Sequence, residues 1–280
     1  MAERRPMTGH GLRPNKRLGQ HFLRESGFIH EILERADFDE SDHILEIGPG
    51  LGALTLPMSK TVRHVFAVEK DPRLAEALGK KLRRGDIHNV TIIHEDILKL
   101  DFDDLPGPIE KKLKIIGNLP YNISSPLLEK LIGNRTLFSR AVLMFQRELA
   151  LRLIASPGSK AYGALTVLIQ YHTSVCPLLD VPGRAFYPRP KVDSMVLGFD
   201  FEAPHPRKAE DEVRFQRVVR GAFAHRRKTL LNALSGVFSS STREDIHGAL
   251  GLCGIDSGRR AETLTIDDFL RLTRATEFLS

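Results

Sequence analysis

Cysteine is nearly absent from this sequence, and its scarcity excludes two classes of protein. Cys176 and Cys253 are the only two among 280 residues, and neither has neighbouring His or Cys residues at ligand spacing. A disulfide framework needs several spaced cysteines, and a structural zinc site needs four clustered ligands. We therefore expect no disulfides, no metal site and a reducing, cytoplasmic environment.

Long apolar runs are missing as well. No stretch has the length and apolar character needed to span a bilayer, and residues 1–17 are basic without the apolar core of a secretory signal. We expect a soluble protein with no membrane partner, and we expect it to be a monomer.

Positive charge is in excess, with a formal net charge of +6. Clustered Lys and Arg favour a polyanionic partner, because they displace counterions from phosphates. The net charge alone fits equally well with a basic enzyme that has no polyanionic partner. The hydrophobic content of 41% is enough to bury a full core in one large and one small domain.

Short apolar runs alternate with helical patterns over the first two thirds of the chain. The predicted strands are 43–47, 65–69, 90–94, 113–116, 141–145, 174–179 and 195–201. Between them, helices are predicted from Ser26 as a cap, from Asp71 and Pro72 as cap and first residue, and from Ser125. This alternation predicts an α/β fold with a doubly wound, mostly parallel sheet that ends in an antiparallel strand pair.

Pro204 and Pro206 interrupt the apolar periodicity and mark a linker. Beyond it the pattern is helical, with an apolar stripe in 215–223, a further helix around 242–252 and one from Thr265, whose hydroxyl pairs with Asp268 in a capping pattern. We predict a flexible basic segment over 1–18, an α/β domain over 19–205 and a small all-helical domain over 206–280.

Three consecutive predicted strands end in residues suited to a nucleoside cofactor. A glycine turn at 48–53 follows the first strand, Glu69 ends the second, and Asp96 follows the third. Gly48 and Gly50 permit close backbone approach, and the two carboxylates can accept hydrogen bonds from ribose hydroxyls and an adenine amine. The turn also matches the dinucleotide pattern, so a nicotinamide-dependent oxidoreductase is an alternative.

The tetrapeptide at 118–121, Asn-Leu-Pro-Tyr, follows the fourth strand and suits transfer to an exocyclic amine. Such an amine is a poor nucleophile, and the Asn118 side-chain oxygen and the Leu119 carbonyl oxygen can hold its two hydrogens. Tyr121 can stack on the base, an interaction worth about 1–3 kcal/mol that offsets the cost of extruding the base. An ordinary Asn-Pro turn beside a core tyrosine is the alternative.

At this point the sequence resembles the ribosomal RNA adenine-N6 dimethyltransferases, which are Rossmann-like class I methyltransferases with a small helical C-terminal domain. The resemblance rests on residues 18–23, 46–52, 118–124, the pattern Phe186-x-Pro188-x-Pro190-x-Val192-x-Ser194, and 225–230. It implies S-adenosylmethionine as the cofactor and makes 19–205 the methyltransferase domain. It also implies that Phe186 covers the face of the target adenine opposite Tyr121.

The resemblance carries the family's cofactor positions over to His21, Leu23, Gly48, Glu69, Asp96 and Asn118. Many members have Asn at the first of these positions, so here a backbone contact from His21 is expected. The basic residues Arg217, Arg220, Arg226, Arg227 and Lys228 are expected near rRNA phosphates, with a solvated charged face as the alternative.

The residues of these motifs resemble those of one branch of the family. That branch dimethylates two adjacent adenosines in the 3′-terminal hairpin of small-subunit (16S) rRNA during ribosome biogenesis. The expected partner is therefore that rRNA in the immature small subunit. Two alternatives stay open, a large-subunit rRNA methyltransferase of the macrolide-resistance type and a non-catalytic rRNA-binding assembly factor.

Overall fold

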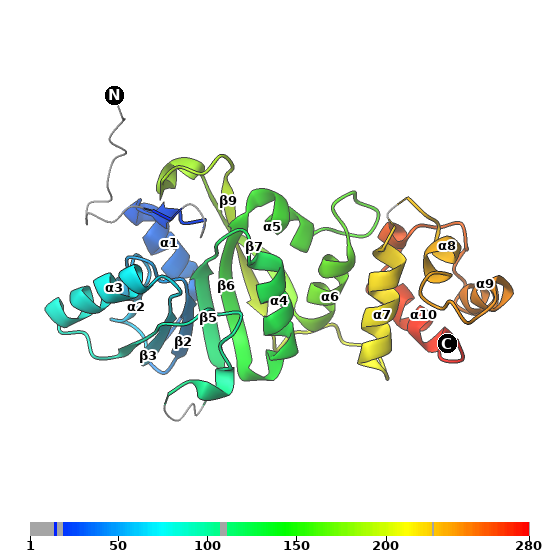
Figure 1. The fold of residues 1–280 in the computed structure, drawn as a ribbon, viewed down its shortest axis with the longest axis horizontal. Coiled ribbons are helices and arrows are strands. Elements are labelled where there is room, and N and C mark those ends of the chain that lie inside the picture. Colours follow the sequence, from blue (N-terminus) through cyan, green and yellow to red (C-terminus); the bar gives the residue numbers. More distant parts are fainter. Residues whose placement is uncertain (1–13, 16–18, 107–110, 226, 280) are drawn as a thin grey trace. The chain divides into compact units, whose positions relative to one another are not determined.

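A computed structural model of the chain describes residues 14–15, 19–106, 111–225 and 227–279 (Figure 1). The chain forms two compact units. The first contains the described residues up to Ala150 together with Cys176–Glu202, and the second contains Leu151–Val175 and the described residues from Ala203 onward. The segment Leu151–Val175 therefore clusters with the C-terminal helices, although the sequence pattern placed it within the domain at 19–205. Of the predicted segment 1–18, all but residues 14–15 lie outside the described residues.

A seven-stranded sheet with the order β4-β3-β2-β5-β6-β9-β7 forms the centre of the first unit. Its strands are β2 (His43–Ile47), β3 (His64–Val68), β4 (Val90–Ile93), β5 (Leu113–Asn118), β6 (Phe138–Gln146), β7 (Ser174–Val181) and β9 (Ser194–Asp200). The five strands from β4 to β6 are parallel to their neighbours, and β9 is antiparallel to β6. The predicted mostly parallel sheet with antiparallel pairing at its end is confirmed.

The strand order reverses direction beside β2. The chain moves outward from β2 through β3 to β4, and then returns to place β5 on the other side of β2. Ligands of doubly wound sheets collect at such a switch point, beyond the carboxyl ends of the strands. β5 extends two residues beyond the predicted strand, and Asn118 pairs with Met144 of β6. The sheet therefore fixes the backbone of Asn118 at this edge.

Helices of the first unit follow the predicted pattern, with one correction. They are α1 (Ser26–Ala36), α2 (Thr55–Met58), α3 (Pro72–Arg84), α4 (Ser124–Gly133) and α5 (Arg147–Leu153), the last of which crosses into the second unit. Asp71 caps α3 as predicted, accepting from the Arg73 amide at 3.1 Å. Ser26 does not cap α1, because the helix already begins at Ser26 and Glu25 occupies the cap position.

One face of the sheet is covered by α1 and α3. Ile32 and Ala36 of α1 and Leu78 and Leu82 of α3 pack in one apolar cluster with strand residues that point to the same side. Those strand residues are Ile44, Val65, Ala67, Ile116, Val142, Met144 and Val196. Because successive side chains of a strand alternate between faces, the intervening apolar residues belong to the other side of the sheet.

A two-stranded antiparallel ribbon lies apart from the main sheet. It pairs β1 (Phe22–Leu23) with β8 (Phe186–Tyr187), so that Phe22 faces Tyr187 and Leu23 faces Phe186. Neither strand is predicted by periodicity, because two residues are too few to show alternation. We call this element the β1–β8 ribbon.

The second unit is helical around a core of its own. Its helices are α6 (Ala164–His172), α7 (Glu212–Phe223), α8 (Leu230–Leu234), α9 (Arg243–Leu252) and α10 (Ile266–Ala275). The predicted stripe of α7 is buried at Phe215, Val218 and Val219. Thr265 and Asp268 form the predicted capping box of α10. Short 3₁₀ turns elsewhere in the chain are Phe102–Asp104, Arg135–Leu137, Gly183–Ala185 and Ala261–Thr263.

Within the described part of the chain, no helix has both the length and the apolar content required to cross a membrane.

Candidate active site

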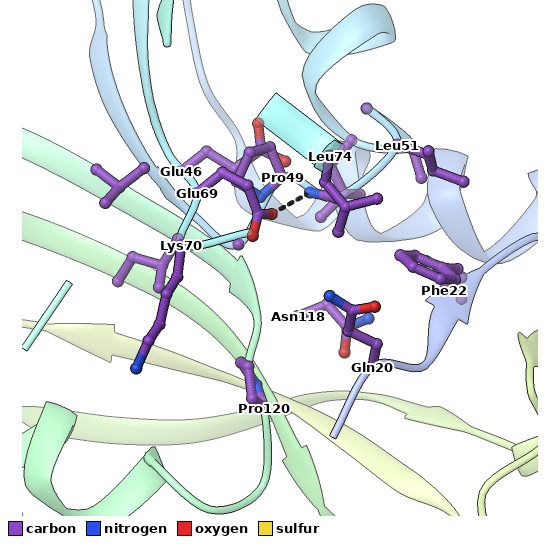
Figure 2. A pocket seen from close by; sticks show the side chains of 18 of the residues that line it. Gln20, Phe22, Glu46, Pro49, Leu51, Glu69, Lys70, Leu74, Asn118 and Pro120 are labelled. Carbon is purple, nitrogen blue, oxygen red and sulfur yellow. Dashed lines mark hydrogen bonds between the residues drawn. The ribbon is translucent and has the colours of Figure 1, made fainter. Parts of the chain in front are cut away.

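A cavity of about 580 Å³ lies at the carboxyl ends of β2, β3 and β5 (Figure 2). All seven predicted cofactor residues line it, namely His21, Leu23, Gly48, Gly50, Glu69, Asp96 and Asn118. Its volume lies in the range usual for small-molecule and cofactor sites. The roles of these residues stay predictions, but the fold brings the residues together.

The glycine turn after β2 is held by Glu69. Gly48 and Gly50 have φ of +68° and +57°, a backbone conformation that a side chain disfavours. The Gly50 amide donates to one Glu69 carboxylate oxygen at 3.0 Å (Figure 2). The Asp71 amide donates to the other oxygen at 2.8 Å. Each oxygen keeps a further lone pair, so the carboxylate can hold the turn and still accept from a ribose hydroxyl.

Asp96 is joined to Lys70, a cavity residue that the sequence analysis did not single out. Lys70 Nζ lies 2.7 Å from one Asp96 carboxylate oxygen, and the Leu98 amide donates to the other at 3.1 Å. The two contacts fix the carboxylate at the edge of the cavity. Because Lys70 directly follows Glu69 at the end of β3, its position beside the site is readable from the sequence once the strand is recognised.

The Asn118 amide has a defined orientation. Its Nδ2 donates to the His21 backbone carbonyl at 2.9 Å. A carbonyl oxygen only accepts, so the amide nitrogen faces His21 and Oδ1 points away from it. Asn118 also lines the cavity. The predicted acceptor Oδ1 is therefore available to a ligand amine.

His21 contacts the site through its side chain as well as its backbone. Its Nδ1 lies 2.7 Å from the Pro188 carbonyl oxygen, so Nδ1 carries the hydrogen. Its ring stacks on Tyr121, with ring centroids 5.6 Å apart and an interplanar angle of 27°. The Tyr121 hydroxyl lies 3.3 Å from Ser194 Oγ. His21 thus joins the segments 118–121 and 186–194.

Three residues predicted to handle the substrate do not line the cavity. Leu119 is 2% exposed, and its amide donates to the Met144 carbonyl at 3.4 Å. Tyr121 is half-buried against His21. Phe186, the first residue of β8, is 4% exposed and packs in the same apolar cluster as α1 and α3. The stacking roles of Tyr121 and Phe186 stay predictions.

Glu46 is a cavity residue that the sequence analysis missed as a site residue. It is 2% exposed, and its Oε2 is buried without a hydrogen-bond partner among the described residues. Burial raises the pKa of Glu46 from its ordinary 4.5 to about 7. An orphaned carboxylate oxygen in a cavity fits a ligand with a hydrogen-bond donor or a positive charge, such as the α-ammonium of S-adenosylmethionine. Two signals in the sequence point to it: an acidic residue inside an apolar strand, and its place as the first residue of the motif at 46–52.

Glu46 gives the cofactor-free protein a predicted pH dependence. Between about pH 4.5 and 7 the folded protein holds a proton on Glu46 that the unfolded chain releases, so the free energy of unfolding falls as pH rises. The loss attributable to this group is on the order of 3 kcal/mol. In Glu46→Gln this loss should disappear. In urea unfolding between pH 5 and 8, the free energy of unfolding of the variant should therefore increase relative to that of the wild type as pH rises. Parallel curves for the two proteins would contradict this assignment.

Four of the five basic residues predicted to contact RNA lie among the described residues of the second unit, Arg217 and Arg220 within α7 and Arg227 and Lys228 between α7 and α8. Arg217 Nη2 donates to the Val237 carbonyl at 2.8 Å, and its guanidinium lies 5.2 Å from the centre of the Phe238 ring. Arg220, Arg227 and Lys228 are exposed. Arg226 lies outside the described residues. A role in RNA binding stays a prediction for all five.

The part of the chain that the structure describes contains no group of three or more His, Cys, Asp or Glu side chains able to hold a metal ion.

Comparison with known proteins gives consistent matches. Residues 11–277 match the family model "Ribosomal RNA adenine dimethylase". The "Ribosomal RNA small subunit methyltransferase A" of Geobacter metallireducens is 45% identical over 271 residues, which cover 96% of this chain and 98% of the relative. The protein of the same name from Desulforapulum autotrophicum is 44% identical over 264 residues, covering 94% of this chain and 92% of the relative.

Two solved structures share the fold over nearly the whole chain. A dimethyladenosine transferase from Plasmodium falciparum has a TM-score of 0.73 and 27% identity, with coverage of 90% of this chain and 95% of that one. The 23S rRNA methyltransferase ErmE has a TM-score of 0.68 and 26% identity, with coverage of 91% and 98%.

Proposed function

Because this chain belongs to the ribosomal RNA adenine dimethylase family, we propose that it transfers methyl groups from S-adenosylmethionine to N6 of adenosines in small-subunit rRNA. The observation that carries the proposal is the orientation of Asn118. Its Nδ2 donates to the His21 carbonyl at 2.9 Å, and its Oδ1, which has no hydrogen-bond partner among the described residues, would accept at the wall of the cavity. An oxidoreductase would leave this arrangement without a role.

The cavity residues fit the cofactor chemically. Glu69 at the end of β3 would accept from the ribose hydroxyls, Asp96 from the adenine amine, and the orphaned Glu46 oxygen from the α-ammonium. When bound, S-adenosylmethionine supplies a methyl group on a positively charged sulfur, an electrophile that needs no further activation. The remaining task of the protein is to prepare the acceptor nitrogen.

Two acceptors suit an amine that is methylated twice. In the first transfer the Asn118 Oδ1 and the Leu119 carbonyl oxygen would hold the two N6 hydrogens, which directs the nitrogen lone pair toward the methyl group. The nitrogen would gain a bond to the methyl carbon as the bond from that carbon to the sulfonium sulfur breaks. The sulfur would leave as a neutral thioether, and the nitrogen would lose one proton to solvent. The monomethylated amine keeps one hydrogen, so one acceptor suffices for the second transfer. Positioning and preorganised hydrogen bonds therefore supply the catalysis, with no strong base required.

The substrate assignment rests on the degree of similarity. The two small-subunit methyltransferases described above are 44% and 45% identical to this chain, whereas the 23S rRNA methyltransferase ErmE is 26% identical. We therefore favour two adjacent adenosines in the 3′-terminal hairpin of 16S rRNA. We propose that the protein binds the immature small subunit as a monomer in the cytoplasm.

The test is methyl transfer from labelled S-adenosylmethionine to undermethylated small subunits, followed by nucleoside analysis of the rRNA. We expect N6,N6-dimethyladenosine at two adjacent positions and none in large subunits supplied as a control. Label in the large subunit would instead support the macrolide-resistance type. Normal subunit maturation in cells that carry only Asn118→Ala would favour a non-catalytic assembly factor.

A further inference from the structure

The β1–β8 ribbon carries a group of positive charges beside the cavity. Arg24 directly follows β1 and lines the cavity itself, while Arg184, Arg189 and Lys191 flank β8. All four are exposed. Only two carboxylates, Glu25 and Asp193, stand within two residues of these four cations in the sequence. We call these four cations the ribbon cluster.

Most of the cluster has no carboxylate partner. Arg184 lies 4.0 Å from a Glu25 oxygen, and Asp193 accepts from the Gly183 amide at 2.8 Å. In the described part of the chain, Arg24, Arg189 and Lys191 take part in no ion pair. Three uncompensated cations on one short element produce a local positive potential, which a solvated face interspersed with acids lacks.

The Arg24 side chain is also positioned. Its guanidinium carbon lies 4.2 Å from the centre of the Tyr187 ring, at the distance of a cation–π contact. Its backbone amide donates to the Ala185 carbonyl at 2.9 Å, which continues the pairing of the ribbon. A planar guanidinium stacked on an aromatic ring has lost part of its freedom before it binds, and it still presents donors at its edge. That arrangement suits a phosphate oxygen.

The ribbon is fixed to the wall of the cavity. His21 lines the cavity, and its Nδ1 donates to the carbonyl of Pro188, which stands between Tyr187 and Arg189. A base that reaches Asn118 must leave its stack, so the phosphates on either side of it pass the mouth of the cavity. Arg189 and Lys191 do not line the cavity, so the cluster extends beyond the space that a cofactor fills.

We infer that the ribbon cluster, led by Arg24 and Arg189, binds the RNA phosphates that flank the target adenosine. The inference rests on the proposed function and adds to it a second RNA-contacting surface, on the first unit, separate from the basic residues of α7. Its ligand is the RNA backbone, so the contacts set affinity and register and carry no sequence information.

The variants to compare are Arg24→Ala, Arg189→Ala, the double variant and Arg24→Lys, with Arg84→Ala as the matched control. Arg84 is an exposed arginine at the end of α3 that does not line the cavity. Each protein is assayed for KM and kcat with undermethylated small subunits, for the salt dependence of RNA binding, and for S-adenosylmethionine affinity by calorimetry. Thermal unfolding verifies that the variants fold.

For the double variant we expect KM for the subunit to rise about tenfold and the slope of log affinity against log salt to shrink by about 0.7–0.9 per lost contact. For Arg189→Ala, whose side chain does not line the cavity, kcat and the cofactor affinity should stay within about twofold of the wild type. Arg24→Lys should lose less RNA affinity than Arg24→Ala because it keeps the charge. Arg84→Ala should match the wild type.

Two results would overturn the inference. One is RNA affinity and salt slope unchanged in the double variant. The other is weakened cofactor binding with intact RNA affinity, which would make Arg24 a partner of the cofactor carboxylate. Failure of the proposed function is separate, since the wild-type protein itself would then put no methyl groups into the small subunit.

Discussion

Asn118→Ala should lower kcat for methyl transfer by about 100- to 1000-fold, the loss typical of removing one preorganised hydrogen-bonding group from an active site. The variant loses Oδ1, which we assign to one N6 hydrogen, and the Leu119 carbonyl oxygen stays. The backbone of residue 118 is held by its pairing with Met144, so the fold should survive. Single-turnover methylation of undermethylated small subunits, with enzyme in excess, measures this step directly.

Asn118→Asp separates the two functions of the amide. The aspartate keeps an acceptor oxygen in the place of Oδ1, but it cannot donate to the His21 carbonyl as Nδ2 does at 2.9 Å. We expect a rate between those of the wild type and Asn118→Ala. A rate equal to that of Asn118→Ala would mean that orientation by His21 matters more than the acceptor, and full activity in either variant would remove Asn118 from the mechanism.

Glu69→Ala should destabilise the protein by about 2–4 kcal/mol and abolish stabilisation by the cofactor. The Gly50 and Asp71 amides both donate to this carboxylate, and each buried donor left without a partner costs about 1–3 kcal/mol. The glycine turn then loses its tie to β3, and the predicted ribose contact is lost with it. Urea unfolding measures the first effect. The rise in melting temperature on adding S-adenosylmethionine, expected for the wild type only, measures the second.

Two further variants make the Glu69 result specific. Glu69→Gln keeps one acceptor oxygen but turns an amide nitrogen toward a backbone donor, so it should lose roughly half of the stability that Glu69→Ala loses. Glu76→Ala removes an exposed carboxylate of α3, which pairs with Lys80, and should change stability by less than about 0.5 kcal/mol. Equal losses in Glu69→Ala and Glu76→Ala would contradict the bracing role.

The main sheet was predictable because its signals are local. The strand predicted at 141–145, for example, is a continuous apolar run, and Asp71-Pro72 marks the start of α3. The segment Leu151–Val175 was not assigned to its unit, since its partners Phe215 and Phe269 are distant in sequence. The β1–β8 ribbon was not predicted either, because two paired dipeptides are too short to show a periodic pattern.

At the site, sequence reasoning named what lines the cavity but not how the pieces are joined. The end of each strand placed Gly48, Glu69, Asp96 and Asn118 along one edge. The His21 carbonyl as partner of Asn118, and the Pro188 carbonyl as partner of His21, depend on backbone positions that no residue type announces. The burial of Glu46 and the exposure of Arg24 at the cavity depend on the folded chain and cannot be predicted from the sequence pattern.

The pairing of Phe22 with Tyr187 and the contact of Asn118 with His21 also set an order of assembly during synthesis. Residues 20–24 leave the ribosome first, but β8, their strand partner, is among the last parts of the first unit to be made. A nascent chain can form β2, β3 and the glycine turn long before Asn118 acquires its fixed orientation. The site is therefore completed only after the last part of the first unit has been made, so a chain that ends before β8 lacks the strand pairing that holds residues 22–23.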